Sequence, residues 1–271
     1  MNKAVSKSLL NMVWVVGAYF VLFYGLIQVY SRFVYPTSGW FEDNPIAFIV
    51  FNDIIQMPIL FFIMLKVRKV HIFKEAGFTK LGMPQVVAIV SIGLLMGWFT
   101  DLFFSLSWIQ EQFPQFEEIL AYLNDGSSVL IFLAFLLYGN IYKEMLFRGM
   151  IFKELRNLSP LAVAIVIQGI LYGGLFFSFD IPLTVYGFLG AVVFALLYVR
   201  YRSIWAPILA QYACQGSQYV FRRSETHVND PNMQYLFLAV TGIAIVAWLI
   251  VIFNKHRRMQ TNNAVREEGA A

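Results

Sequence analysis

Eight long apolar stretches dominate the sequence and leave few folds open to it. They cover residues 9–30, 45–65, 84–106, 128–152, 160–179, 181–199, 203–221 and 233–253. A transmembrane helix needs about 20 largely apolar residues, and each stretch reaches or approaches that length. Because 59% of the residues are hydrophobic and the mean hydropathy is +0.65, the composition lies outside the range of ordinary soluble domains. We therefore expect an all-α, polytopic transmembrane bundle with about eight spans.

The basic residues indicate how these spans are oriented. With a cytoplasmic N-terminus, sixteen of the 20 lysines and arginines fall on the inner side, Lys143 lies within a span, and three fall outside: Arg32, Arg222 and Arg223. Cytoplasmic loops of membrane proteins carry such an excess. We expect both termini in the cytoplasm and a multi-pass protein of the bacterial plasma membrane. The net charge of +4 follows from this topology, so no nucleic-acid partner is expected.

The chain is expected to form one domain, because it shows neither internal repeats nor low-complexity linkers. Its parts are the N-terminal spans (1–127), a core with polar motifs (128–220), a last span (221–254) and a polar tail (255–271) that we expect to be disordered. The segment from Lys66 to Gly82 is either a short helix on the inner surface or a solvated loop. The acidic loop from Ser107 to Gly126 is an outer amphipathic helix, a docking surface or an interfacial cap.

The fourth stretch carries the most telling charges. Asn140, Glu144 and Arg148 recur every four residues, with Lys143 beside them, so they share one broad helix face. A charge near the bilayer centre costs at least about 2.5–3.5 kcal/mol and usually faces protein, water or a partner charge. Glu144 and Arg148 can pair. Lys143 points about 100° away from Glu144, so it either pairs with Asp53 or Asp101 or extends its ammonium group toward the inner surface.

Two further stretches carry polar residues at helical spacing. Gln211, Gln215 and Gln218 lie on one face of the seventh stretch, together with Cys214. Amides at this spacing either hydrogen-bond neighbouring helices or form part of a site. In the fifth stretch Gln168, Tyr172 and Phe176 share one face, and Gly173-Gly174 permits close approach of another helix.

Several residue types are missing from the spans. All three histidines (His71, His227 and His256) lie outside them, and Cys214 is the only cysteine. Zinc sites and Cys–His nucleophiles need such side chains close together, so we expect no metal and no cofactor. The carboxylates left for acid–base chemistry are Glu144, Asp53 and Asp101, with Asp180 at the outer edge.

The core resembles the CAAX prenyl endopeptidase and bacteriocin-processing (CPBP or Abi) family, which includes lysostaphin-resistance-type membrane proteins. The family signature is Glu-Glu-x-x-x-Arg on one helix, Phe-x-x-x-His on the next, and His-x-x-x-Asn two helices later. Here the first motif reads Lys143-Glu144-x-x-x-Arg148-Gly149. The last follows Trp205-Ala206-Pro207 and ends at Gln211-x-x-x-Gln215, and the middle one best matches Tyr172-Gly-Gly-Leu-Phe176.

The resemblance implies that the first glutamate is a general base toward water and that the histidines assist at the scissile amide, with a debated role for a metal. In this chain Lys143 replaces that glutamate, Phe176 the middle histidine, Gln211 the later histidine and Gln215 the asparagine. Only Glu144 and Arg148 of the motif are retained. A protonated lysine accepts no proton, and acid–base help is worth about 10²–10⁴-fold. We therefore expect a pseudoprotease that binds another membrane protein, or a peptide or lipid-linked segment, beside membrane lipid.

Two other functions stay open from the residues alone. One is an active intramembrane endopeptidase that uses Glu144, and the other is a small-solute or ion transporter that uses Asp53, Asp101 and Lys143.

The depth of the motifs in the membrane is also open. At about 1.5 Å per residue, Glu144 lies ~12 Å and Phe176 ~24 Å from the inner edge. Either the fifth span begins earlier, or the middle motif is misaligned.

Overall fold

The computed structural model of the chain is built from helices, with no strand among the residues that it describes. The structure describes residues 3–37, 39–67, 69, 71–224, 228 and 230–268. For residues 3, 4, 67 and 253–268 it describes the backbone alone. Residues 255–268 of the predicted tail continue the last helix, which differs from the disorder expected there. Residues 269–271 and His227 lie outside the described residues, and so does the side chain of His256. The all-α class expected from the sequence is confirmed.

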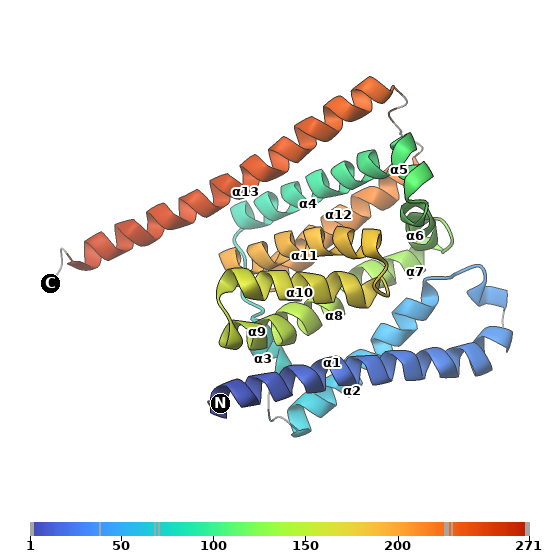
Figure 1. Cartoon of the computed structure of the whole chain (residues 1–271), viewed down its shortest axis with the longest axis horizontal. Helices are drawn as coiled ribbons and strands as arrows, with labels where there is room; N and C mark the ends of the chain where they lie inside the picture. Colours follow the sequence, from blue (N-terminus) through green and yellow to red (C-terminus); the bar gives the residue numbers. More distant parts are fainter. Residues whose placement is uncertain are drawn as a thin grey trace.

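The chain runs back and forth along the length of the bundle. The long segments are α1 (Lys3–Val29) with its π-helical extension η1 (Tyr30–Val34), α2 (Ala47–Val67), α4 (Met83–Phe104), α10 (Leu161–Phe176), α11 (Ile181–Tyr201), α12 (Trp205–Arg223) and α13 (Pro231–Glu268). Between α4 and α10 one continuous rod contains α7 (Val129–Ala134), η4 (Phe135–Gly139), α8 (Asn140–Glu144), η5 (Met145–Ile151) and α9 (Phe152–Leu158). Figure 1 shows consecutive long segments running in opposite directions.

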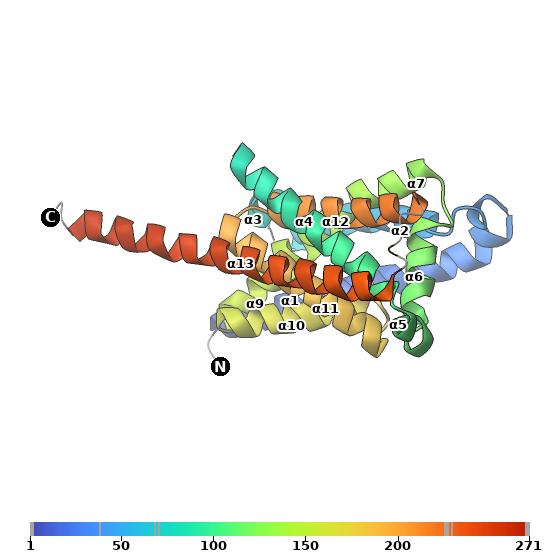
Figure 2. The ribbon, with the colours of Figure 1, turned by 90° about the horizontal axis from the view of Figure 1, so that it is seen from above.

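Short helices lie at the two ends of the bundle. The start of α1 lies at the end that holds α3 (Ile72–Ala76), whereas α5 (Ser107–Gln112) and α6 (Gln115–Asn124) lie at the other end (Figure 1). The turns η2 (Tyr35–Thr37) and η3 (Gly39–Phe41) connect α1 to α2. Figure 1 shows α13 at the edge of the bundle next to α4, and Figure 2 shows the two helices crossing at an angle.

Six helical segments in the described part of the chain are long and apolar enough to cross a membrane. They are Val5–Thr37, Ala47–Lys66, Met83–Phe104, Val129–Leu158, Ile181–Tyr201 and Pro231–Ile252. The other two predicted spans correspond to α10, which is apolar but has only 16 residues, and to α12, whose glutamines and arginines lower its hydropathy. The chain is thus a multi-pass membrane bundle, and the count of eight spans stays a prediction.

Both loops that the sequence left open contain short helices packed on the bundle. In α3, Ile72 and Ala76 are buried, and Ala76 lies against Gly149 of the rod. In α6, Phe116 and Leu120 pack with Phe104 of α4 and with Leu183 of α11. The acidic loop is therefore a cap, since its apolar face covers one end of the bundle.

The rod α7–α9 is longer than its apolar stretch. The sequence predicted an end near residue 152, but the helix continues to Leu158, which adds about 9 Å at 1.5 Å per residue. Glu144 now lies fourteen residues before the end of the rod, and Phe176 lies fifteen residues after the start of α10. The two positions therefore reach nearly equal depth. This removes the conflict in depth without an earlier start of the fifth span and without a new alignment.

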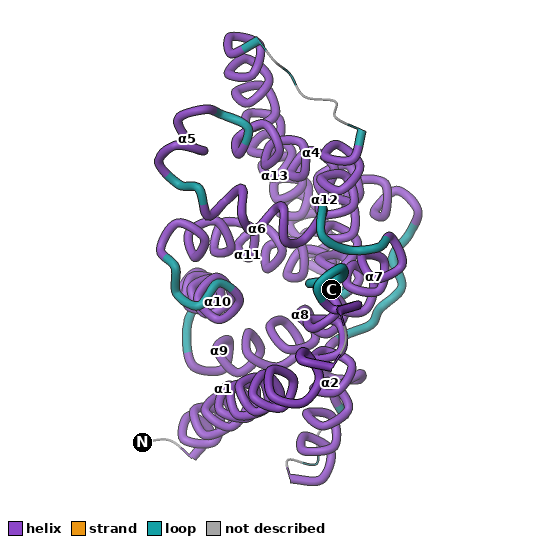
Figure 3. Tube along the Cα trace, turned by 90° about the vertical axis from the view of Figure 1, so that its right-hand side faces the viewer, coloured by secondary structure: helices purple, strands orange, loops and turns teal. Residues whose placement is uncertain are grey.

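Glycines set the closest helix contacts. A Cβ at Gly97 would overlap Ser217 Oγ and Cys214 O of α12, and one at Gly173 would overlap Thr184 O of α11. The close approach predicted at Gly173 is thus confirmed. Viewed along the bundle, α4 lies beside α12, and α10 lies beside α11 (Figure 3). These contacts hold the four helices at fixed separations.

We expect Gly97→Val to lower the melting temperature in detergent, because part of the overlap is with backbone and can be relieved only by moving α4 from α12. Overpacking of this kind costs about 1–3 kcal/mol. Gly17→Val is the matched control, since Gly17 has open space around it. Equal melting temperatures for the two variants would contradict this tight packing.

Candidate functional site

A cavity of about 440 Å³ lies inside the bundle. Its walls come from α1, α2, α4, α6, the rod, α10, α11, α12 and α13, and most of them are aromatic or aliphatic. The polar and reactive side chains among its lining residues are Tyr19, Asp53, Thr100, Lys143, Tyr172, Tyr186, Cys214, Gln215 and Gln218. Some of the sequence-predicted polar positions thus line this cavity, whereas others lie behind its wall or elsewhere.

One set forms a buried polar group that we call the Glu144 cluster: Glu144, Arg148, Tyr172 and Gln211. Glu144 Oε1 accepts hydrogen bonds from Arg148 Nη1, at 2.8 Å, and from Gln211 Nε2. Arg148 Nη2 donates to the carbonyl oxygen of Ala191 in α11 at 2.8 Å, and the Tyr172 hydroxyl donates to Gln211 Oε1 at 3.2 Å. The cluster therefore joins the rod to α10, α11 and α12.

The carboxylate of this cluster is separated from the cavity. Both side chains of the Glu144–Arg148 pair have no exposed surface, and neither residue is among the lining residues. Glu144 Oε2 and Arg148 Nε lack a hydrogen-bond partner among the described residues. The π-helical turn η5 begins directly after Glu144 and contains Arg148, and such irregular turns are frequent at functional sites.

Lys143 belongs to the cavity wall. Its Nζ lies 4.5 Å from the ring centre of Phe135 and 5.2 Å from that of Phe176, which are cation–π contacts. It also interacts electrostatically with Asp53 of α2. Of the two partners considered from the sequence, the structure places Asp53 beside Lys143. Gly139 makes room for this arrangement, since a Cβ there would lie 3.1 Å from Asp53 Oδ2.

The remaining motif positions lie close by. Phe176 packs against Tyr172 and Phe147, with ring centres 4.8 and 5.3 Å apart. Asn140 Nδ2 donates to Gln215 Oε1 at 2.7 Å, and Asn140 is fully buried outside the lining, whereas Gln215 is in it. Lys143, Phe176 and Gln215 thus line the cavity, while Glu144, Arg148 and Gln211 lie outside it.

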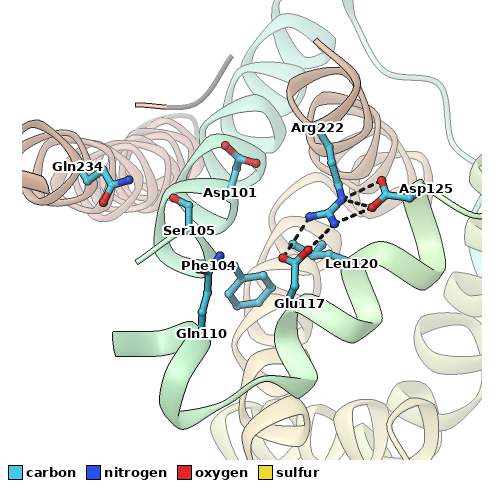
Figure 4. A pocket seen from close by; sticks show the side chains of 9 residues that line it. All are labelled: Asp101, Phe104, Ser105, Gln110, Glu117, Leu120, Asp125, Arg222 and Gln234. Carbon is cyan, nitrogen blue, oxygen red and sulfur yellow. Dashed lines mark hydrogen bonds and ion pairs between the residues drawn. The ribbon is translucent and has the colours of Figure 1, made fainter. Parts of the chain in front are cut away.

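Asp101 lies elsewhere, in a second pocket of about 530 Å³ at the α5–α6 end (Figure 4). It stands three residues before the end of α4, which places it near the end of the bundle. In this pocket Arg222 of α12 pairs with Glu117 and, at 2.6 Å, with Asp125 Oδ2. Phe104 and Leu120 line both pockets, and we call these two shared residues the partition.

Sequence reasoning missed Arg222, Phe135 and Gly139. Arg222 carried a signal, because it is one of three basic residues on the predicted outer side. Phe135 and Gly139 carried none, since both are ordinary residues of an apolar helix. Their roles follow only from how the rod packs on α2.

The motif positions do not fit a metal ion. Lys143 offers a cation no lone pair while protonated, Phe176 has no ligand atom, and Glu144 Oε1 is already held by Arg148. Among the described residues no three His, Cys, Asp or Glu side chains come together as a ligand group.

Loss of the arginine in the Glu144 cluster should be costly. Arg148→Met leaves a carboxylate buried without its cation, so we expect the free energy of unfolding to fall by about 3–5 kcal/mol. The double variant Glu144→Gln/Arg148→Met should be more stable than Arg148→Met, as measured by chemical unfolding in detergent. Lys153→Met, which breaks an exposed pair with Glu75, is the control and should change stability by less than about 1 kcal/mol. A small effect of Arg148→Met would show that the pair is not structural.

The Arg222 pairs should restrict entry to the central cavity. Cys214 lines that cavity and is 6% exposed, so its rate of reaction with a small maleimide reports on access. We expect Arg222→Gln to raise this rate about two- to fivefold, because α6 and the residue that follows it then lose their ion pairs with α12. Lys153→Gln, at the other end of the bundle, should leave the rate unchanged. An unchanged rate in Arg222→Gln would show that the partition does not depend on these ion pairs.

Comparison with known proteins supports the family resemblance of the core. Residues 125–216 match a family model described as Rce1-like, type II CAAX prenyl endopeptidase. No curated protein and no solved structure gave a match to the chain. The matched segment contains every motif-position residue, from Lys143 to Gln215. Residues 125–216 are therefore similar to the Rce1-like family of type II CAAX prenyl endopeptidases, and they lie in a chain that is a multi-pass membrane protein.

Proposed function

We propose that this protein is a catalytically degenerate member of its family, which binds an apolar, membrane-embedded segment in the central cavity without cutting it. The observation that carries the proposal is the position of Glu144. Its Oε1 is engaged by Arg148 and Gln211, and the residue lies outside the cavity lining. A general base must come within about 2.6–3.2 Å of the proton that it removes, directly or through one water.

The side chains that do face the cavity are poorly suited to hydrolysis. Lys143 stands where the family resemblance places the base, and a charged ammonium group accepts no proton. Phe176 stands at the position of a histidine and has no acid or base to offer. Gln215 can donate and accept hydrogen bonds but cannot transfer a proton to a leaving amine. The wall therefore supports binding better than chemistry.

The cavity has the properties of a binding site. Its volume of about 440 Å³ lies within the range of ~300–1,000 Å³ that is typical of ligand pockets. Its walls are apolar, with a few polar groups that can orient a ligand. The partner we propose is another membrane protein, or a peptide or lipid-linked segment, that inserts an apolar portion from the surrounding membrane.

The first experiment tests cleavage. Purified protein in lipid nanodiscs is incubated with apolar peptides, beside the variants Glu144→Gln and Lys143→Ala. We expect all three proteins to give the same background. The proposal would be overturned if the unaltered protein cleaved a peptide and Glu144→Gln abolished that cleavage. If Lys143→Ala abolished the cleavage as well, the mechanism would depend on the lysine.

The second experiment tests binding in cells. A photocrosslinking amino acid replaces Phe176 in the cavity or, as the control, Phe62, which is 62% exposed on α2. We expect a reproducible partner only from position 176. Gly190→Leu should reduce its capture by filling the cavity, whereas Gly17→Leu on exposed α1 should not. Equal capture from both crosslinker positions would contradict binding in the cavity.

One observation favours a second function, an active intramembrane endopeptidase. Glu144 Oε2 has no hydrogen-bond partner among the described residues, although it is buried. A free carboxylate oxygen could serve a water that reached it from the cavity. The cleavage experiment with Glu144→Gln decides between this function and the binding role.

A further inference from the structure

Lys143 is a primary amine enclosed by the apolar wall of the central cavity. Its side chain is 9% exposed and lines the cavity, as do Phe135 and Phe176, the two rings that its Nζ contacts. A charge in such surroundings is costly, and binding of an apolar segment alone does not require an amine. The lysine therefore indicates a use for its amine.

Asp53 of α2 supplies a carboxylate close to this amine. It is 5% exposed, lines the same cavity and interacts electrostatically with Lys143. Its Oδ2 has no hydrogen-bond partner among the described residues, so this oxygen can accept a proton. Glu144 also interacts electrostatically with Lys143, but its Oε1 is held by Arg148. Asp53 is therefore the carboxylate of the cavity wall that can exchange a proton with the lysine.

The pair can produce a nucleophile without separating charge. When a proton moves transiently from the Lys143 ammonium group to the Asp53 carboxylate, the sum of the two charges stays at zero, and the nitrogen gains a free electron pair. Lysines that are removed from water in apolar pockets act as nucleophiles toward carbonyl groups in this way. A cavity that excludes bulk water also protects the product from hydrolysis.

We propose that Lys143 forms a Schiff base with an aldehyde carried on an apolar chain. Nζ attacks the carbonyl carbon, a C–N bond forms, and the carbonyl oxygen takes the proton that Asp53 holds. Asp53 then takes a second proton from Nζ and gives it to the hydroxyl group, which leaves as water while the nitrogen electron pair completes the C=N bond. One ammonium group and one aldehyde thus give one protonated Schiff base and one water, with Asp53 again a carboxylate. No oxidant or reductant is needed.

The surroundings of Lys143 favour an aldehyde over an acyl donor. A protonated Schiff base keeps the positive charge near Asp53 and over the rings of Phe135 and Phe176. Acylation would form a neutral amide and leave the Asp53 carboxylate buried without its cation, which is strongly destabilising. The walls are mostly aromatic or aliphatic, so they suit an apolar chain. This inference rests on the proposed function, because the cavity has to admit an apolar ligand.

The unaltered protein contains its own control. Lys66 of α2 is exposed, and its Nζ lies 5.9 Å from the ring centre of Phe62. Protein in phosphatidylcholine nanodiscs, whose lipid has no primary amine, is incubated with decanal and sodium cyanoborohydride, which reduces a Schiff base to a stable amine. Peptide mass spectrometry then measures the rate of alkylation at each lysine. We expect decanal to alkylate Lys143 about tenfold faster than Lys66, because the cavity holds the aldehyde beside the amine.

A polar aldehyde tests the class of ligand. With glyceraldehyde we expect Lys66 to react faster than Lys143, because the apolar walls disfavour a hydrophilic ligand. A preference for Lys143 with both aldehydes would overturn the apolar class, and equal or slower alkylation of Lys143 by decanal would overturn the inference. Both comparisons use one unaltered protein, so neither depends on the folding of a variant.

The role of Asp53 is tested by the charge of the Schiff base. 4-Butylbenzaldehyde gives a conjugated Schiff base that absorbs at longer wavelength when it is protonated, and a nearby carboxylate favours this charged form. We expect the longer-wavelength band in the unaltered protein and its shift to the shorter wavelength of the neutral form in Asp53→Asn. Asp43→Asn, at an exposed position, is the control and should keep the protonated band. Lys143→Arg keeps a positive charge but cannot form a Schiff base, so it should lose the band. A protonated band in Asp53→Asn would overturn the role of Asp53.

Failure of this inference differs from failure of the proposed function. If decanal alkylates Lys143 and Lys66 equally while the crosslinker at position 176 still captures a partner, the Schiff base alone is overturned. If decanal selects Lys143 and the unaltered protein also cleaves peptides in a Glu144-dependent manner, the proposed function alone is overturned.

Discussion

The fold of the core depends on a buried ion pair. Glu144 and Arg148 have no exposed surface, and their remaining contacts reach the backbone of α11 and the side chain of Gln211 in α12. Removing two charges from water costs several kcal/mol per ion, so such a pair needs further hydrogen bonds from nearby groups. Here α11 and α12 each supply one of them, which links both helices to the rod. An element that resembles a catalytic motif thus also acts as a structural joint.

This joint and the cavity wall use different residues. The residues that hold the helices lie outside the cavity lining, whereas Lys143 and Phe176 face inward. Changes at those two positions alter what the cavity can hold, and neither residue takes part in the hydrogen bond between Glu144 and Arg148. A family fold can therefore keep its core while its interior surface changes.

Much of the fold follows from the sequence, because hydropathy reports length and composition, and helical spacing reports which residues share a face. Those two rules identified the long helices and placed Glu144 with Arg148. They did not give the end of the rod, since Lys153 and Arg156 lower the hydropathy of a helix that continues to Leu158. Neither rule fixes how deep one helix lies relative to another. Asp53 and Asp101 were therefore equal candidates for Lys143, and only packing separated them.

The partition formed by Phe104 and Leu120 has a consequence for the shape of both pockets. Both side chains lie between the apolar interior and a polar pocket at the end of the bundle, since each lines both of them. Side-chain rotation is faster than the collective movement of helices. A change of rotamer at either residue therefore alters the shape of both pockets at once, without rearrangement of the bundle.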